Sequence, residues 1–128
     1  MGLVTITGTL TTDESPARSM TSSYTIEVEG FSEETRPVGT TYELIAATAD
    51  AGATYMETVV INTGAQEAVV RVNTDGTNYI FLPLPAYAQI IIPKAMVPTG
   101  TTMVAVNQVH ARALTGTSIL RVIALFVA

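Results

Sequence analysis

His110 is the only histidine in the chain, and it is the first residue to weigh for chemistry. A histidine-based triad needs a serine and an acid beside the imidazole, and the sequence has no Gly-x-Ser-x-Gly elbow to present that serine. Zinc needs several nitrogen or sulfur ligands, whereas the chain has one histidine and no cysteine. We therefore interpret His110 as an ordinary strand residue that shares its face with Arg112. We predict no catalytic, cofactor-binding or metal-binding residue and no enzymatic activity.

Carboxylates are the second group of candidates. Glu27 and Glu29 would share one face of a strand, and paired carboxylates serve in glycoside hydrolysis. No second acidic cluster or aromatic sugar platform accompanies them, so a solvated strand face is the better interpretation. The acidic segment from Asp13 to Pro16 lacks the alternating oxygen ligands of a calcium-binding loop and is interpreted as a solvated loop. No glycine-rich phosphate loop with a following lysine is present.

The charge balance bears on partners and on the compartment. The net charge is -5, and six scattered basic residues form no patch that could neutralise phosphates, so we predict no nucleic-acid binding. No apolar run approaches the roughly 18 residues of a membrane helix. The start of the chain, Met1 to Thr5, lacks the basic region of a signal peptide. We therefore predict a chain that neither binds membranes nor uses a signal-peptide route.

Low charge combined with high apolar content indicates assembly. Hydrophobic residues make up 48% of the sequence and charged residues only 13%, whereas charged side chains normally keep molecules apart. Threonine is abundant, and its branched side chain with a hydroxyl suits a strand face that is half wet or packed on another chain. With no cysteine for disulfides, stability must come from packing. We predict a homo-oligomer, and specifically a trimer.

The clearest elements lie between Thr58 and Pro93. Val59 to Ile61 is a short apolar run that ends at a turn beginning with Asn62, and the next run, Ala68 to Val72, ends at Asn73-Thr74-Asp75-Gly76. Asp75-Gly76 is the stronger turn, since glycine tolerates positive φ. Tyr79 to Leu82 follows as a strand, and the prolines after it predict a sheet edge or a crossing between sheets. Tyr87 to Ile92 resumes β structure until Pro93.

The N-terminal part is harder to interpret. Leu3 to Leu10 predicts a strand, either an ordinary core strand containing Val4, Ile6 and Leu10 or an arm on a neighbouring molecule, and Gly8 weakens it as a central strand. The polar stretch Thr11 to Ser23 predicts a loop or linker. We accordingly predict an N-terminal strand or arm with its linker over residues 1–23 and a sandwich domain over residues 24–128. Within the latter we expect a strand over Tyr24 to Glu29, a loop over Phe31 to Thr40, and a strand over Thr41 to Thr48, where a short helix is the alternative.

The C-terminal part predicts three further strands. Lys94 to Gly100 reads as a loop, and the strands that follow are Thr102 to Val106, Val109 to Leu114 and Ile119 to Val127. The last is apolar on both faces apart from Arg121, so it should be covered on both. About nine or ten short strands with no convincing helix predict an all-β chain, specifically a β-sandwich of jelly-roll or related Greek-key type.

Several features of residues 58–128 occur together in one class of proteins. They are a strand ending at Asn62, a strand pair over residues 68–79, an aliphatic and proline segment over residues 84–93, and Ala111-Arg112-Ala113 before the last strand. In this order they resemble small β-sandwich structural proteins of tailed bacteriophage particles. Where such proteins often have Pro-Gly or Ala-Gly before the aliphatic strand, this chain has Ala86-Tyr87.

The resemblance implies a virion structural protein. A capsid decoration or cement protein is expected first, one that stabilises a phage head through contacts with the major capsid protein or another virion protein and is assembled in the host cytoplasm. A tail, collar or head-fibre component is the near alternative. A carbohydrate-binding β-sandwich is the alternative from another class, although the chain has no tryptophan and only 6% aromatic residues for ring stacking.

Overall fold

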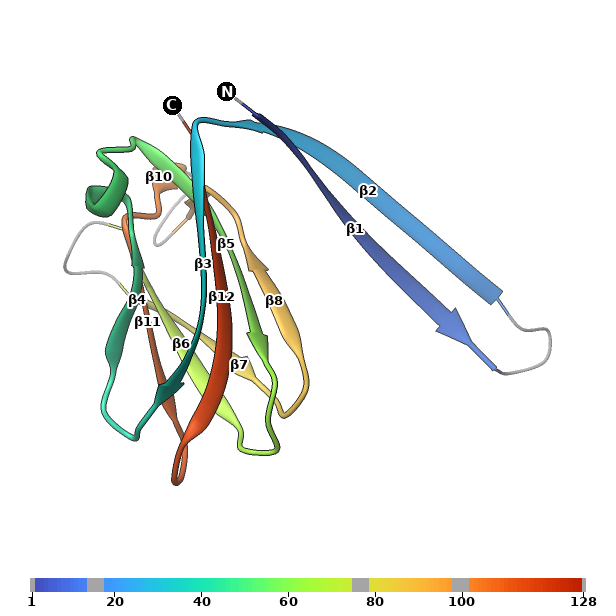
Figure 1. The fold of residues 1–128 in the computed structure, drawn as a ribbon, viewed down its shortest axis with the longest axis vertical. Helices are drawn as coiled ribbons and strands as arrows, with labels where there is room; N and C mark the ends of the chain where they lie inside the picture. Colours follow the sequence, from blue (N-terminus) through green and yellow to red (C-terminus); the bar gives the residue numbers. More distant parts are fainter. Residues whose placement is uncertain (1, 14–17, 75–78, 98–101, 128) are drawn as a thin grey trace.

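The chain folds into a β-sandwich with a long hairpin projecting from it (Figure 1). The computed structural model describes residues 2–13, 18–74, 79–97 and 102–127. Within them lie twelve strands and one short 3-10 helix, η1 (Thr48–Ala51). The strands are β1 (Gly2–Thr12), β2 (Arg18–Val28), β3 (Gly30–Val38), β4 (Glu43–Ala47), β5 (Tyr55–Asn62), β6 (Ala68–Asn73), β7 (Tyr79–Leu84), β8 (Gln89–Ile92), β9 (Ala95–Met96), β10 (Val104–Ala105), β11 (Gln108–Ala113) and β12 (Ser118–Val127).

Eight of these strands form two antiparallel sheets that face each other. The first, in the order β3-β12-β5-β8, is called the β12 sheet here, and the second, in the order β4-β11-β6-β7, the β11 sheet. The pairings are nested, because β6 with β7 lies within β5 with β8, then β4 with β11, then β3 with β12. Eight strands paired in this nested order and divided between two four-stranded sheets form a jelly roll. The predicted all-β sandwich is therefore confirmed.

The core lies between the two sheets and is formed by alternate residues. Strand β5 alternates half-buried and buried positions along its whole length, as does β11, because successive side chains of a strand point to opposite faces. Burying one large aliphatic side chain contributes about 1.5–3 kcal/mol. Fully buried side chains from both sheets include Val38, Met56, Val60, Val70, Val72, Leu84, Ile92, Val109 and Leu120.

The turn after β5 is held by a buried amide. Asn62 is fully buried, and its Nδ2 donates to the backbone oxygens of Gln66 at 2.6 Å and of Leu84 at 3.3 Å. The backbone N–H of Gly64 donates to Asn62 Oδ1 at 3.1 Å. Since β5 and β6 belong to different sheets, this side chain fixes the point where the chain passes from one sheet to the other. The predicted turn at Asn62 is confirmed.

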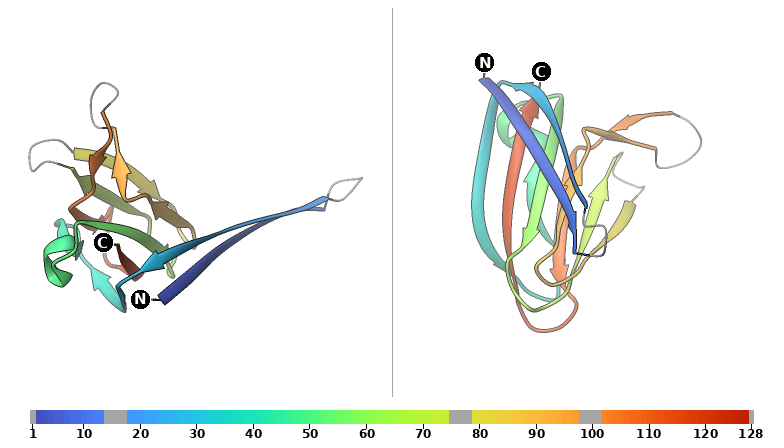
Figure 2. Two further views of the ribbon diagram at one scale, coloured as in Figure 1. Left: turned by 90° about the horizontal axis from the view of Figure 1, so that it is seen from above. Right: turned by 90° about the vertical axis from the view of Figure 1, so that its right-hand side faces the viewer.

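Strands β1 and β2 form a hairpin that stands outside the sandwich. Their register runs from Gly2 opposite Val28 to Thr12 opposite Arg18, and Figure 2 shows the pair leaving one end of the sandwich and extending away from it. Val4 and Ile6 accordingly lie outside the core. The predicted linker over Thr11 to Ser23 is wrong, since β1 continues to Thr12 and β2 begins at Arg18. The hairpin also ends at Val28 rather than at residue 23, so the expected start of the sandwich domain was too early.

The loop predicted over Phe31 to Thr40 is a second error. Residues Gly30–Val38 form β3, an edge strand paired with β12. Of its inward positions, Ser32 and Glu34 are exposed and Arg36 is half-buried, and only Val38 belongs to the core. Arg36 donates there to the backbone oxygen of Leu44 and pairs with Glu34. A strand with polar residues on both faces shows no apolar alternation, and the sequence pattern therefore missed it.

Most other strand predictions are confirmed. A strand, not a helix, occupies Glu43–Ala47, and β7 is the edge of its sheet and contains Pro83. The expected loop after Pro93 contains β9, which pairs with β10. The predicted turn at Asp75-Gly76 lies outside the described residues. The described part of the chain contains twelve strands against the nine or ten expected, because β3 and β9 occupy stretches that were predicted as loops.

The last strand differs from expectation in one respect. Strand β12 lies between β3 and β5, and its inward residues Leu120, Val122 and Ala124 are buried as predicted. On its outer face only Leu125 is buried, whereas Ile119 is exposed. The predicted cover on both faces is therefore only partly present within the chain.

Candidate assembly surfaces

The hairpin has two unlike faces. Cross-strand partners share a face, so the pairs Val4 with Ile26 and Ile6 with Tyr24 lie on one side together with Met20. We call this side the apolar arm face. The other side, the threonine arm face, carries hydroxyl pairs, with Thr5 Oγ1 at 3.0 Å from Thr25 Oγ1 and Thr9 Oγ1 at 3.4 Å from Thr21 Oγ1. A threonine face is suited to water and an aliphatic face to a partner.

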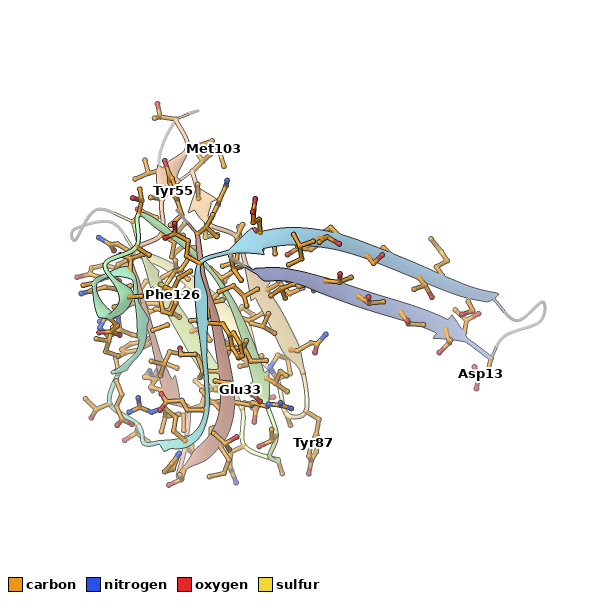
Figure 3. All side chains as sticks on the ribbon, turned by 45° about the horizontal axis from the view of Figure 1, so that its top comes forward. Asp13, Glu33, Tyr55, Tyr87, Met103 and Phe126 are labelled. Atoms are coloured by element: carbon orange, nitrogen blue, oxygen red, sulfur yellow. The ribbon has the colours of Figure 1, made fainter. Side chains whose placement is uncertain are left out.

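The apolar arm face is uncovered toward the tip of the hairpin. Met20 is 67% exposed and Tyr24 44%, whereas Val4, Ile6 and Ile26 are half-buried. Figure 3 shows the side chains of both strands standing clear of the sandwich as far as Asp13. An isolated two-stranded hairpin is marginally stable in water, and three strands or a packed surface are needed for independent stability. The hairpin therefore lacks, within its own chain, the cover that its apolar face requires.

The root of the hairpin is fixed to the β12 sheet. Tyr24 Oη donates to a carboxylate oxygen of Glu57 at 2.9 Å, and the backbone N–H of Glu29 donates to the oxygen of Phe126 at 2.9 Å. Val28 is buried there, as is Leu125 on the outer face of β12. Burial and the hydrogen bond to Glu57 raise the pKa of Tyr24 to about 12. The hairpin thus has a defined starting point on the sandwich.

Beyond the root, the outer face of the β12 sheet carries an apolar surface. Arg121 lies there and pairs with Glu33, and Glu57 is the acceptor for Tyr24. Around these paired charges the register of β3, β12, β5 and β8 aligns aliphatic and aromatic side chains. We call this surface the outer β12 face. Its apolar members are Phe31, Val59, Ile61, Ile91, Ile119 and Ile123, of which Phe31 is 63% exposed.

The outer face of the β11 sheet has a different character. The guanidinium carbon of Arg71 lies 4.4 Å from the ring centroid of Tyr42 and 4.7 Å from that of Tyr79, and Arg112 lies 5.5 Å from Tyr42. Phe81 is 6.3 Å from Tyr42 and 58% exposed. Such contacts contribute about 0.5–2 kcal/mol each. We call these five residues the arginine–tyrosine cluster.

His110 borders this cluster. It pairs across the strands with Arg71 and shares its face with Arg112, as the alternation of β11 predicted. Burial and the positive charge of Arg71 lower the pKa of His110. The described residues place no carboxylate within hydrogen-bonding distance of its imidazole, and its Nδ1 is buried without a partner among them. The geometry does not assemble a catalytic triad around this residue.

The carboxylates considered from sequence do not form one group on the structure. Glu27 is exposed on the threonine arm face opposite Leu3. Glu29 follows the end of β2, so the two do not continue one strand face. Asp13 is exposed near the tip of the hairpin, and Glu14 lies outside the described residues. Among the described residues, no group of three or more His, Cys, Asp or Glu side chains could hold a metal ion.

Sequence reasoning missed both the apolar arm face and the arginine–tyrosine cluster. The first had a usable signal, because Met20, Tyr24, Ile26 and Val28 all fall on even positions, although Ser22 interrupts the series. For the arginine–tyrosine cluster the only local signal was that Tyr79 and Phe81, two residues apart, would share one face of a strand. The cluster joins residues from β6, β7 and β11 and the loop before β4, and no local pattern announces which strands pair.

Tyr87 is a further residue that the sequence did not single out for contact. It is 72% exposed and adopts φ 60, the left-handed region that favours glycine. The N–H of Ala88 donates to the oxygen of Pro85, which closes a turn with Tyr87 at its third position. A non-glycine residue there costs about 1–2 kcal/mol. An exposed aromatic ring kept at that cost is a candidate contact with a partner.

No helix in the described part of the chain is long and apolar enough to cross a membrane. The candidate contact surfaces are the apolar arm face, the outer β12 face and the arginine–tyrosine cluster, together with the exposed ring of Tyr87. Comparison of the chain with protein-family models, with curated proteins and with solved structures gave no match in any of the three.

Proposed function

We propose that this chain is a non-enzymatic structural protein of a virion, acting as a capsid decoration or cement protein. Such a protein works by burying surface between molecules and needs no catalytic residues. The jelly roll supplies a rigid body, and the hairpin supplies an extension with which to hold a neighbour. Jelly rolls serve viral capsids and lectins alike, so the surfaces of the molecule, and not its fold, support this role.

The observation that carries the proposal is the uncovered hairpin. Two 11-residue strands that project from the sandwich and leave Met20 67% exposed are only marginally stable without cover. A partner that covers the apolar arm face would gain about 25 cal/mol for each Å² of apolar surface removed from water. The outer β12 face offers a second surface of the same kind. Together they favour an assembly component over a free monomer.

The proposed partners are further copies of the chain, as a homotrimer, and the major capsid protein or another virion protein. The proposed location is the virion, after assembly in the host cytoplasm. A tail, collar or head-fibre position would use the same surfaces.

Immunoelectron microscopy tests this role. Antibodies raised against the folded chain should label particles pelleted from the source culture, with label on the shell surface. Label on the tail or collar would move the chain to the alternative position. Particles that carry no label, with the chain found only in the supernatant, would contradict a virion role.

A second candidate is carbohydrate binding, and the arginine–tyrosine cluster favours it. Tyr79 and Phe81 expose side chains on one face of the β11 sheet beside Arg71 and Tyr42. Exposed rings are the surfaces on which sugars stack, and a guanidinium can bind their hydroxyls or carboxylates.

A glycan array with the folded chain tests this candidate. Binding that is lost in Phe81→Ala but kept in Phe31→Ala, an exposed phenylalanine of the other sheet, would support a sugar site. Absence of binding to every glycan on the array would remove this candidate.

A further inference from the structure

We propose that the apolar arm face of one copy of this chain docks on the outer β12 face of a second copy. The inference rests on the assembly role proposed above and names the partner for the hairpin. It also assigns both uncovered apolar surfaces to one contact. The arm lies across the sheet face and does not extend the sheet at its edge.

The two surfaces match in chemistry. The apolar arm face presents Met20 toward the tip and Val4, Ile6 and Ile26 nearer the root, where the hydroxyl of Tyr24 is held by Glu57 of the same chain. The outer β12 face presents aliphatic and aromatic side chains around two carboxylates that already have partners, since Glu33 binds Arg121 and Glu57 accepts from Tyr24. Docking therefore removes apolar surface from water without burying an unpaired charge, which would cost several kcal/mol.

The same two surfaces already meet at the hairpin root. Tyr24 belongs to the apolar arm face, and its partner Glu57 belongs to the outer face of the β12 sheet. Val28 and Leu125 are buried where the hairpin joins the sandwich. A contact of this kind is thus compatible with the geometry of both surfaces, and docking of a second arm would continue it over the remainder of the sheet.

The hairpin cannot make the larger contact with its own sandwich. Figure 2 shows β1 and β2 running outward from the end of the sandwich, so the outer β12 face beyond the root stays open. Strands of 11 residues are about 36 Å long, whereas a four-stranded sheet is about 15–20 Å wide. One arm is long enough to cross the whole sheet of a neighbouring copy.

Gly8 gives independent support. It lies in the middle of β1 on the apolar arm face, opposite Ser22, and a Cβ added there would meet no atom within 4 Å. Its backbone is in no conformation that demands glycine, so the single chain gives no reason for this residue. A glycine inside a strand weakens the strand and often marks a close approach of another backbone. The second copy supplies that approach.

The symmetry of the contact follows from its two unlike halves. An arm on one molecule and a face on the next form a heterologous contact, which closes into a ring when the rotation permits. A ring of three copies agrees with the proposed trimer.

Light scattering on the full-length chain tests the proposal with four exposed-site variants. Met20→Glu places a charge on the apolar arm face, and Ile91→Glu places one on the outer β12 face. Thr7→Glu on the threonine arm face and Phe81→Glu on the β11 sheet are the matched controls, since each adds the same charge at an exposed position. Circular dichroism confirms that every variant remains folded.

The wild type and both controls should show a ring mass, which is three times the 13.5 kDa chain mass for the trimer. Met20→Glu and Ile91→Glu should each fall to one chain mass. Mixing those two variants should restore a complex of two chains, because the intact arm of Ile91→Glu can dock on the intact face of Met20→Glu. A monomeric wild type, loss of association in the controls, or a mixture that stays monomeric would overturn the proposal.

Gly8→Val adds a test of close approach. Where the chain is monomeric, the variant should leave the melting temperature unchanged or raise it. At higher concentration it should weaken self-association, and unchanged association would overturn that step. The two proposals also fail separately. Self-association without particle labelling contradicts the virion role, and particle labelling by a chain that stays monomeric in pure solution contradicts docking between copies.

Discussion

The sandwich and the hairpin are built from the same kinds of residues and differ in what covers them. Leu120 in β12 and Ile6 in β1 both belong to strands that are rich in β-branched and aliphatic residues. Leu120 is fully buried between two sheets, whereas Ile6 has only the facing strand and is half-buried. Alternation in a sequence thus predicts that one strand face will be covered, but it does not say whether the same chain supplies the cover.

This difference separates fold stability from assembly. The energy that holds the jelly roll comes from side chains between the β12 and β11 sheets, and the hairpin adds no residue to that set. We therefore expect substitutions in the sandwich to change unfolding and substitutions on the apolar arm face to change association.

Leu120→Ala should have the largest effect on stability. A buried leucine truncated to alanine loses its transfer free energy and leaves a cavity, which together cost about 2–5 kcal/mol. Met20→Ala on the hairpin should cost under about 0.5 kcal/mol, because an exposed side chain has little to lose. Urea unfolding of both variants under conditions where the chain is monomeric measures the contrast. Equal losses would show that the hairpin belongs to the same cooperative unit as the core.

Asn62→Ala should follow. The variant removes the amide that donates to the backbone oxygens of Gln66 and Leu84 and accepts from the N–H of Gly64. Because Ser118 Oγ still donates to the Gln66 oxygen, the loss should be about 2–3 kcal/mol in total. The matched change on the hairpin is Thr5→Ala, which breaks an exposed hydroxyl pair with Thr25 that water replaces. That variant should cost under about 0.5 kcal/mol. Thermal unfolding of both measures the difference, and a loss in Thr5→Ala as large as in Asn62→Ala would contradict the view of the hairpin as a marginal element.

The strands that the sequence predicted and those that it missed also differ in whether the core of the sandwich covers one of their faces. Strands β5, β6, β8 and β12 were found because core strands are rich in apolar residues, and their short apolar runs are bounded by turn residues or proline or by the end of the sequence. Strand β3 was missed because its inward residues Ser32, Glu34 and Arg36 lie at an open edge. The part of β2 from Arg18 to Ser23 was missed because serine and threonine dominate it.

The candidate surfaces show a second limit of local pattern. That His110 and Arg112 share a face follows from strand geometry, and the structure confirms it. That Arg71 lies beside His110, between the rings of Tyr42 and Tyr79, depends on which strands pair across tens of residues. Pairing between strands so far apart in the sequence depends on how all the strands pack around one core. The residues near His110 alone therefore cannot predict it.

Tyr87→Gly should stabilise the sandwich by about 1 kcal/mol. Glycine removes the cost of a positive φ at position 87, about 1–2 kcal/mol, and part of that gain is offset by the greater freedom of glycine in the unfolded chain. Tyr87→Ala is the control, since it removes the ring but keeps the Cβ that causes the strain. A rise in melting temperature for glycine alone would confirm the backbone explanation. An equal rise for alanine would mean that the exposed ring, and not the backbone, is unfavourable.

The smallest expected effect is a pH dependence from His110, on the half-wet outer face of the β11 sheet. Its pKa is lowered by burial first and by the charge of Arg71 second, so the folded state disfavours the proton that the unfolded chain accepts near pH 6.5. A depressed folded pKa contributes stability that is full above about pH 6.5 and is lost as the pH falls through the folded value. His110→Gln should therefore lose less stability than the wild type between about pH 6.5 and pH 5, measured by urea unfolding at each pH.

Arg71→Gln should return the His110 midpoint in an NMR titration only part of the way toward its ordinary value, because burial is the larger cause. An unchanged slope in His110→Gln, or a wild-type midpoint at or above the ordinary value, would contradict the assignment, since the positive charge beside the imidazole would then have no energetic consequence for folding.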